Sequence, residues 1–76
     1  MRLVLVTRQG CHLCDQALDQ LRDLGHDPEL ADVDSDDRLH DLYDWRVPVL
    51  LADDRVVAEG KITLDQLEKA VGRGTR

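Results

Sequence analysis

Both cysteines of this 76-residue chain lie within four consecutive residues, Cys11-His12-Leu13-Cys14. Cysteines that stabilise a small secreted domain are usually spread along the chain, where their disulfides close long loops. A disulfide that closes a four-residue loop contributes only about 2 kcal/mol by chain entropy, against about 3 kcal/mol for a fifteen-residue loop. The chain must therefore fold around a hydrophobic core of its own. At this point the cysteine pair is interpreted in three ways, as a redox dithiol, as half of a metal site, or as two buried thiols.

The length and composition indicate one small globular domain, with 42% hydrophobic and 34% charged residues. We assign residues 1–72 to this domain and residues 73–76 to a flexible C-terminal tail. Nucleic acids and anionic membranes are bound through lysine and arginine, so a net charge of −6 argues against both partners. No apolar run approaches the ~20 residues of a membrane span, and none resembles a signal peptide. We therefore expect a cytoplasmic protein, and we expect it to be a monomer.

The hydrophobic pattern alternates between strand-like and helix-like segments. Residues 2–6 form a short apolar run that is typical of a buried strand. From Cys14 to Leu24 the apolar residues recur at helical spacing, and Gly25 suits the end of this helix. The pattern further predicts strands over 29–34, 47–52 and 55–59, a turn at 53–54, a helix that Ser35 caps, and a last helix from a capping box at 63–66 to Gly72.

The predicted element order is β-α-β-α-β-β-α, without repeats or linkers. A strand, a helix and a second strand imply a parallel pair joined by a right-handed crossover. The later hairpin implies antiparallel neighbours. We therefore predict an α/β fold, with a four-stranded mixed sheet and three helices.

Cys11 falls between the first predicted strand and the first predicted helix. A helix N-terminus carries about half a positive elementary charge and free N–H groups, both of which stabilise a thiolate. In CxxC sites of this kind the thiol pKa falls from about 8.5 to between about 3.5 and 7.5, which makes Cys11 the candidate nucleophile. Cys14 lies one turn later on the apolar face of the helix, where it can reach Cys11. We therefore expect Cys14 to be the less exposed, resolving thiol.

The segment from Thr7 to Cys14, followed later by Arg46-Val47-Pro48 at the start of a strand, resembles glutaredoxins and their thioredoxin-fold relatives. The resemblance covers nearly the whole chain in element order and length. It implies a thiol–disulfide oxidoreductase that reduces protein disulfides or glutathione mixed disulfides. It also implies that Pro48 is a cis-proline beside the cysteines and that Val47 offers backbone hydrogen bonds to the bound thiol peptide. No resident cofactor is implied, and glutathione or a reductase is the expected electron donor.

Two arginines are further substrate-binding candidates through the same resemblance. Arg8 stands where glutaredoxins commonly have a lysine near the thiolate and the glutathione carboxylate. Arg46 flanks Val47 and Pro48 and is expected to add positive charge there. In an acidic protein, two arginines beside one site suggest an anionic peptide ligand, whereas the structural alternative is that each is a solvated surface charge.

The chain also departs from the family pattern. His12 and Leu13 replace the usual Pro-Tyr between the cysteines. We expect a protonated His12 to favour the thiolate and Leu13 to form an apolar lip. Gly60 matches one glycine of a family Gly-Gly pair, and the acidic pair that holds the amino end of glutathione is missing. The resemblance therefore supports redox chemistry more strongly than it supports glutathione as the partner.

Two other functions compete with the redox hypothesis. In the first, Cys11 and Cys14 bind a metal ion or an iron–sulfur cluster. Tetrahedral zinc needs four ligands, and only the three histidines remain to supply the other two, since no second CxxC is present. A ligand pair shared across a dimer and a glutathione-bridged iron–sulfur cluster are the other forms of this alternative, and we assign no residue as a metal ligand. In the second, the chain is a non-catalytic thioredoxin-fold module that binds a partner.

The sequence assigns structural roles to one tryptophan and to a series of aspartates. Trp45 is predicted to fill the core, because a lone tryptophan after a helix is most often buried. The aspartates lack the glycine and the terminal glutamate of a calcium loop, so helix capping and solvation are the expected roles. They are Asp32, Asp34, Asp36, Asp37, Asp41 and Asp44.

Overall fold

The computed structural model of the chain describes residues 2–73, and the proposed tail therefore lies outside the described residues except for Arg73. The predicted order of helices and strands is confirmed. The elements are β1 (Leu3–Thr7), α1 (His12–Asp23), β2 (Glu29–Asp32), the short 3-10 helix η1 (Val33–Ser35), α2 (Asp37–Tyr43), β3 (Val49–Ala52), β4 (Arg55–Glu59) and α3 (Leu64–Val71).

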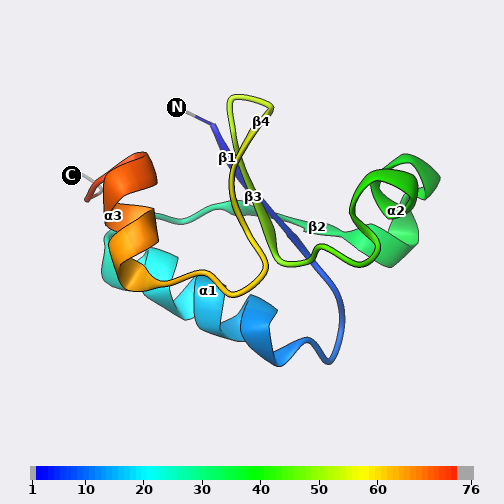
Figure 1. Cartoon of the computed structure of the whole chain (residues 1–76), viewed down its shortest axis with the longest axis horizontal. Coiled ribbons are helices and arrows are strands. Elements are labelled where there is room, and N and C mark those ends of the chain that lie inside the picture. The colour runs from blue at the N-terminus through cyan, green and yellow to red at the C-terminus, as the bar shows by residue number, and fades with distance from the viewer. Residues whose placement is uncertain (1, 74–76) are drawn as a thin grey trace.

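The sheet is mixed, as predicted, with the strand order β2-β1-β3-β4. β1 and β2 are parallel because α1 carries the chain back across one face of the sheet, and Leu5 pairs with Leu30. β1 and β3 are antiparallel, and Val6 pairs with Val49. Figure 1 shows α1 and α3 side by side, with α2 set apart from them. The end of β1 therefore lies beside the start of β3, and both connect to loops at the same edge of the sheet.

The central strands β1 and β3 contribute to two separate hydrophobic clusters, one on each face of the sheet, because successive residues of a strand point to opposite sides. Leu5 and Leu50 belong to the larger cluster, together with the fully buried Leu21 of α1 and Leu67 of α3. The adjacent residues Val6 and Val49 belong to the second cluster. That cluster also includes Val33 of η1, and Leu39 and Tyr43 of α2 pack against it.

Helix α1 ends where the sequence predicts. Gly25 has a φ of 88°, in the left-handed region that glycine tolerates best. Its N–H donates to the Arg22 carbonyl at 2.9 Å, and the His26 N–H donates to the Leu21 carbonyl at 2.9 Å. These two bonds form a Schellman motif, which satisfies the last carbonyls of the helix and turns the chain towards β2.

Three predicted segment boundaries are wrong. The strand predicted over 47–52 begins at Val49, after the cis bond between Val47 and Pro48. The strand predicted over 29–34 ends at Asp32, because Val33 turns into η1 and becomes fully buried in the second cluster. The N-cap of α2 is Asp36 rather than Ser35. The Asp36 carboxylate accepts from the N–H groups of Arg38 and Leu39, and Ser35 instead donates to the Asp32 carbonyl. The shift of one residue follows from the 3-10 turn, which the hydrophobic pattern does not reveal.

The prediction that Trp45 fills the core is wrong, since 91% of this residue is exposed. Trp45 lies in the turn between α2 and β3, where the Arg46 N–H donates to the Tyr43 carbonyl at 2.9 Å. The smaller side chains of the second cluster, with Tyr43 packed against it, cover this face of the sheet. The turn therefore directs the indole away from the core.

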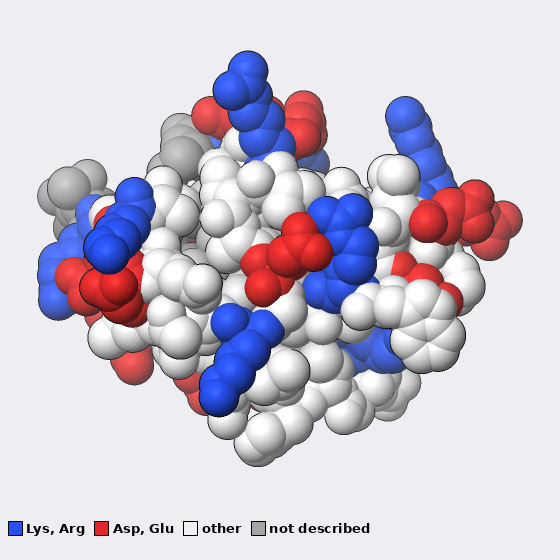
Figure 2. Space-filling model, in the orientation of Figure 1, with Lys and Arg blue, Asp and Glu red and all other residues white. Residues whose placement is uncertain are grey.

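The surface carries charges of both signs. Figure 2 shows basic and acidic side chains next to one another on the face that it presents. Between residues 2 and 73, no helix has the length and the apolar character needed to span a membrane.

Candidate active site

Cys11 and Cys14 lie at the start of α1, as predicted. Cys11 is the N-cap residue, with an extended backbone, and the first residue of the helix follows it. The Cys14 N–H donates to the Cys11 sulfur at 3.2 Å. The two residues form a disulfide, with Cα atoms 5.2 Å apart. The Cys11 sulfur therefore lies at the positive end of the helix dipole and has a hydrogen-bond donor of its own, an environment that favours the thiolate over the thiol.

The two cysteines differ in burial in the predicted direction. Cys14 is only 2% exposed, on the same face of α1 as the buried Ala17 and Leu21. Cys11 is partly exposed, and the exposed Gly10 precedes it with a φ of 78°. A disulfide that approaches from solvent can therefore reach the sulfur of Cys11 but not that of Cys14.

Val47 and Pro48 lie on the loop before β3, and Gly60 follows β4 and is hydrogen-bonded to Pro48. The peptide bond between Val47 and Pro48 is cis, as the resemblance implied. The antiparallel pairing of Val6 with Val49 brings Pro48 to the end of β1, from which the cysteine loop departs. The Gly60 N–H donates to the Pro48 carbonyl at 2.8 Å. Among residues 2–73 the N–H and C=O of Val47 have no backbone hydrogen-bond partner. The predicted binding of a thiol peptide by Val47 stays a prediction.

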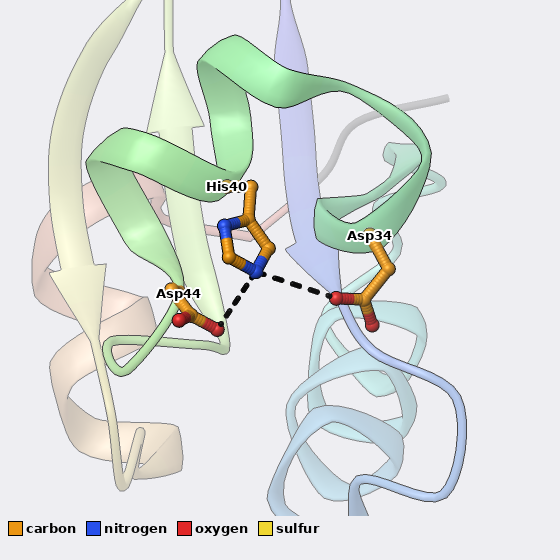
Figure 3. Close-up of side chains that lie close together, drawn as sticks. All are labelled: Asp34, His40 and Asp44. Atoms are coloured by element: carbon orange, nitrogen blue, oxygen red, sulfur yellow. Dashed lines mark ion pairs between the residues drawn. The ribbon is translucent and has the colours of Figure 1, made fainter.

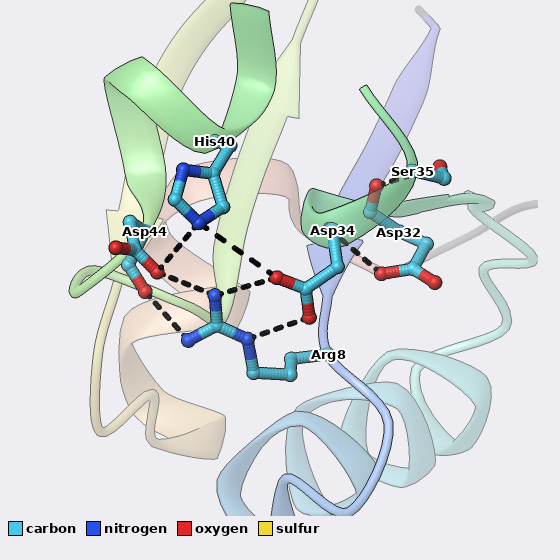
Figure 4. Close-up of polar contacts among 6 residues, drawn as sticks. All are labelled: Arg8, Asp32, Asp34, Ser35, His40 and Asp44. Carbon is cyan, nitrogen blue, oxygen red and sulfur yellow. Dashed lines mark hydrogen bonds and ion pairs between the residues drawn. The ribbon is translucent and has the colours of Figure 1, made fainter. Parts of the chain in front are cut away.

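The Arg8 side chain is held by two carboxylates, Asp34 of η1 and Asp44 at the end of α2 (Figure 4). Nε and Nη2 donate to the two oxygens of Asp34, each at 2.9 Å. Nη1 donates to the Asp44 carbonyl at 3.0 Å, and Nη2 donates to the Asp44 carboxylate. The hydrogen bonds from Arg8 lower the pKa of Asp34 below its ordinary value, and Asp34 and Asp44 raise the pKa of Arg8. The predicted contact of Arg8 with thiolate or ligand stays a prediction.

Arg46 is also held by a carboxylate of the chain. Nε and Nη2 donate to the two oxygens of Glu59 at 2.9 and 2.7 Å, which lowers the pKa of Glu59. The guanidinium carbon lies 5.2 Å from the centre of the Tyr43 ring. This pair is more exposed than the Arg8 pairs, and the predicted role of Arg46 in substrate binding stays a prediction.

Residues 2–72 match the family described as Glutaredoxin-like domain (DUF836). The chain belongs to this family. One similar solved structure is the NMR structure of a protein from Nitrosomonas europaea, with 32% identity, a TM-score of 0.77, and coverage of 90% of this chain and 87% of that one. Another is the X-ray structure of a structural genomics target from X. campestris, with 32% identity, a TM-score of 0.75, and coverage of 88% and 91%. A search of the curated proteins finds no match.

In this glutaredoxin-like domain, the two residues between the cysteines point outward. His12 and Leu13 are exposed, and the exposed fraction of Leu13 is 37%. One ring nitrogen of His12 lies 3.2 Å from the side-chain nitrogen of Gln16, one turn later. Both residues are therefore accessible to a substrate bound at Cys11, and their roles stay predictions.

A groove of about 380 Å³ lies beside the cysteine loop of the glutaredoxin-like domain, on the side of β2. Gly10, Cys14, Leu18 and Leu30 line it. Half of Leu30 is exposed there, so the groove has an apolar wall close to the buried cysteine. Arg8 and other residues of the segment that leads into α1 also line it, beside α1 and β2. The groove was not visible in the sequence, because only the crossover brings these segments together.

One group of side chains in residues 2–73 has the donor set for a metal ion, and it contains neither cysteine. Ligand atoms of Asp34, His40 and Asp44 lie within 4.8 Å of one another (Figure 3). His40 Nε2 is 3.4 Å from the Asp44 carboxylate and 3.9 Å from that of Asp34. The guanidinium of Arg8 already binds both carboxylates, so an ion bound there would have to displace it.

Capping and solvation are the roles that the sequence predicts for these aspartates, which is right for two that cap helices and wrong for two others. Asp32 and Asp36 cap η1 and α2. Asp34 and Asp44 instead bind Arg8, which lies 26 and 36 residues away in sequence. No spacing rule connects residues so far apart, so the pairing was not visible in the sequence.

Proposed function

We propose that this chain is a thiol–disulfide oxidoreductase, with Cys11 as the nucleophile and Cys14 as the resolving thiol. The observation that carries the proposal is the asymmetry of the pair. Cys11 is partly exposed at the N-terminus of α1. Cys14 is buried one turn later, and its sulfur is close enough to form a disulfide with that of Cys11. Membership of the glutaredoxin-like family supports the same chemistry.

The reaction starts from the reduced dithiol. The Cys11 thiolate attacks one sulfur of a substrate disulfide, the substrate S–S bond breaks, and the first substrate thiolate leaves and takes up a proton. Cys14 then loses its proton and attacks the Cys11 sulfur. The mixed disulfide breaks and the second substrate thiol is released. The substrate gains two electrons, and the chain keeps the Cys11–Cys14 disulfide until glutathione or a reductase reduces it.

The substrate lies, in this proposal, between the cysteines and the loop that carries Val47. The free N–H and C=O of Val47 bind the backbone of the substrate, and Pro48 and Gly60 hold that loop in place. Leu13 contributes an apolar edge. We propose that Arg46 and His12 contact charged or polar groups of the substrate at the rim.

Protein disulfides and glutathione mixed disulfides are the proposed substrates. We propose that residues 1–72 act as one monomeric domain in the cytoplasm, where a reducing environment recycles a dithiol. No resident metal ion or cofactor takes part in the proposed reaction.

The test uses the reduced chain and a peptide that carries a glutathione mixed disulfide. The wild type is expected to release the free peptide thiol, and Cys14→Ser to accumulate an adduct on Cys11 that intact-mass spectrometry detects. Cys11→Ser is expected to be inactive, because no exposed nucleophile remains. If the wild type leaves the disulfide intact with both reduced glutathione and a thioredoxin-type reductase as donors, the proposal is wrong.

A further inference from the structure

We propose that Arg8 is a positioning residue, which fixes the loop carrying Cys11 against the loop carrying Val47 and Pro48. This inference rests on the proposed function, because it concerns the two sides of the same substrate site. It differs from the role implied by the family resemblance, in which this position supplies positive charge to the thiolate or to a ligand carboxylate.

The backbone of Arg8 is tied to the nucleophile. The Cys11 N–H donates to the Arg8 carbonyl at 3.1 Å, which closes the turn that leads into α1. The Arg8 side chain extends from this turn to the other loop, as Figure 4 shows. One residue therefore holds Cys11 with its main chain and reaches the second loop with its guanidinium.

On the second loop, Arg8 binds both the side chain and the main chain of Asp44. Asp44 is the C-cap residue of α2 and lies three residues before Val47. The bond from Nη1 to the Asp44 carbonyl fixes the backbone at the point where the chain leaves the helix. Asp34 holds the other edge of the guanidinium through two parallel bonds, which set its orientation.

The contacts with Asp34 and Asp44 require the planar guanidinium group of arginine. Three nitrogens of Arg8 donate in different directions, to Asp34 and to two groups of Asp44. A lysine ammonium has a similar charge but is one point at the end of a flexible chain, and it cannot make these contacts together. The side chain of Asp44 is only 22% exposed and that of Arg8 27%, so water competes less for the bonds between these two residues than at an open surface, whereas Asp34 is about half-exposed.

The charge of Arg8 is compensated where it lies. Its guanidinium is in contact with two carboxylates, and His40 is the additional titratable group beside them. The local group has more negative than positive charge when His40 is neutral. The group therefore adds no net positive charge beside the cysteine loop, and positioning is the role that these contacts support.

The test compares two reactions of the reduced chain that make different demands on the site. Alkylation by iodoacetamide needs only the Cys11 thiolate, whereas reduction of the glutathionylated peptide needs both loops. For Arg8→Met we expect kcat/KM for the peptide to fall about tenfold to a hundredfold, mostly through KM, because small misplacements of a binding group have effects of this size. The pH profile of alkylation is expected to stay unchanged. Arg8→Lys should not restore the peptide reaction.

The Asp34→Asn variant distinguishes a positioning role of Arg8 from a role of its charge, because the two roles predict different effects on peptide reduction and on alkylation. If Arg8 positions the loops, Asp34→Asn lowers peptide reduction, and combining it with Arg8→Met causes little further loss. If Arg8 acts through its charge, Asp34→Asn frees that charge, and alkylation shifts to lower pH. Arg2→Met is the matched control, since Arg2 pairs with Glu29 at the opposite end of β1 and should leave both reactions unchanged. An alkylation profile that Arg8→Met moves to higher pH and Arg8→Lys restores would overturn the proposal.

Amide hydrogen exchange separates this inference from the proposed function. In Arg8→Met we expect faster exchange at the amides of both Cys11 and Arg46, because each amide closes a turn that Arg8 connects. Arg2→Met should leave these amides unchanged. Exchange that is unaltered in Arg8→Met would contradict the coupling of the two loops, whether or not the wild type reduces disulfides. A chain that shows the coupling but no reduction would instead contradict the proposed function.

Discussion

Single side chains in this chain take their roles from partners that are distant in sequence. Arg8 and Arg46 both lie close to residues of the candidate site, as the sequence indicated, but each guanidinium is bound by carboxylates of the chain itself. Trp45 is exposed because the turn that carries it faces away from a filled cluster. In each case the residue type and the sequence position were informative, and the contacts were decided by the fold.

The pairing of Asp34 with Arg8 predicts a pH-dependent contribution to stability. The pKa of Asp34 is lowered in the folded state, so its ionised form stabilises the fold above its unfolded pKa of about 3.9. This stability is lost as the pH falls through the lowered, folded pKa. Thermal unfolding should therefore give a lower Tm for Asp34→Asn than for wild type at pH 7, and the difference should shrink below about pH 4.

Asp41→Asn is a suitable control for this experiment, because Asp41 is exposed on α2 and makes no ion pair to another residue in the described part of the chain. The Tm difference between Asp41→Asn and wild type should be small and nearly independent of pH. A Tm difference for Asp34→Asn that is constant down to pH 3 would contradict the prediction.

At the level of elements, local sequence signals determine where most helices begin and end. The capping box of α3 is formed as predicted, with the Thr63 hydroxyl accepting from the Gln66 N–H at 3.2 Å and the Gln66 side chain accepting from the Thr63 N–H at 3.0 Å. The end of α1 is also determined by a local signal, Gly25, which closes the helix. The start of α2 was misplaced by one residue because the preceding 3-10 turn depends on burial of Val33.

The start of α2 gives a test with two adjacent residues. Asp36→Ala removes the carboxylate that accepts from two N–H groups of the first turn, so we expect the free energy of unfolding to fall by about 1 kcal/mol. Ser35→Ala removes only one exposed bond to a carbonyl and should have a smaller effect. Urea unfolding of both variants measures the difference. An equal or larger loss for Ser35→Ala would support the cap that the sequence suggested.

The whole molecule depends on a small sheet whose central strands β1 and β3 are covered on both faces. With 76 residues, the two clusters together contain few large side chains, and no polar or charged residue between 2 and 73 is buried as a whole. A small domain of this kind has a low free energy of unfolding. The candidate site lies at the edge where β1 ends and β3 begins, so its geometry depends on the integrity of this sheet.

Leu50 lies in the central strand β3 and is fully buried, so Leu50→Ala should leave a cavity in the larger cluster. We expect the free energy of unfolding to fall by about 2–5 kcal/mol, a large part of the total for so small a domain. Leu42→Ala is the matched control, since 52% of Leu42 is exposed. Its effect should stay within about 0.5 kcal/mol in the same urea titration. Comparable losses for the two variants would show that the core is assigned wrongly.

Local periodicity, capping residues and the CxxC pair were enough to determine the element order, the mixed sheet and the position of Cys11 at a helix start. These features depend on residues that are close in sequence, where spacing translates directly into geometry. The position of Cys11 at a helix start and the burial of Cys14 were therefore predictable from the residues themselves, whereas the place of Pro48 beside them was implied by the family resemblance.

Only the tertiary structure decided which charges pair and which surfaces stay exposed. The contacts of Arg8 with Asp34 and Asp44 join three segments that come together only when α1 crosses the sheet and α2 covers its other face. The exposed Trp45 and the groove beside Cys14 have the same origin. The physical reason is that a side-chain contact depends on the positions of two elements in space, whereas sequence spacing describes the geometry of one.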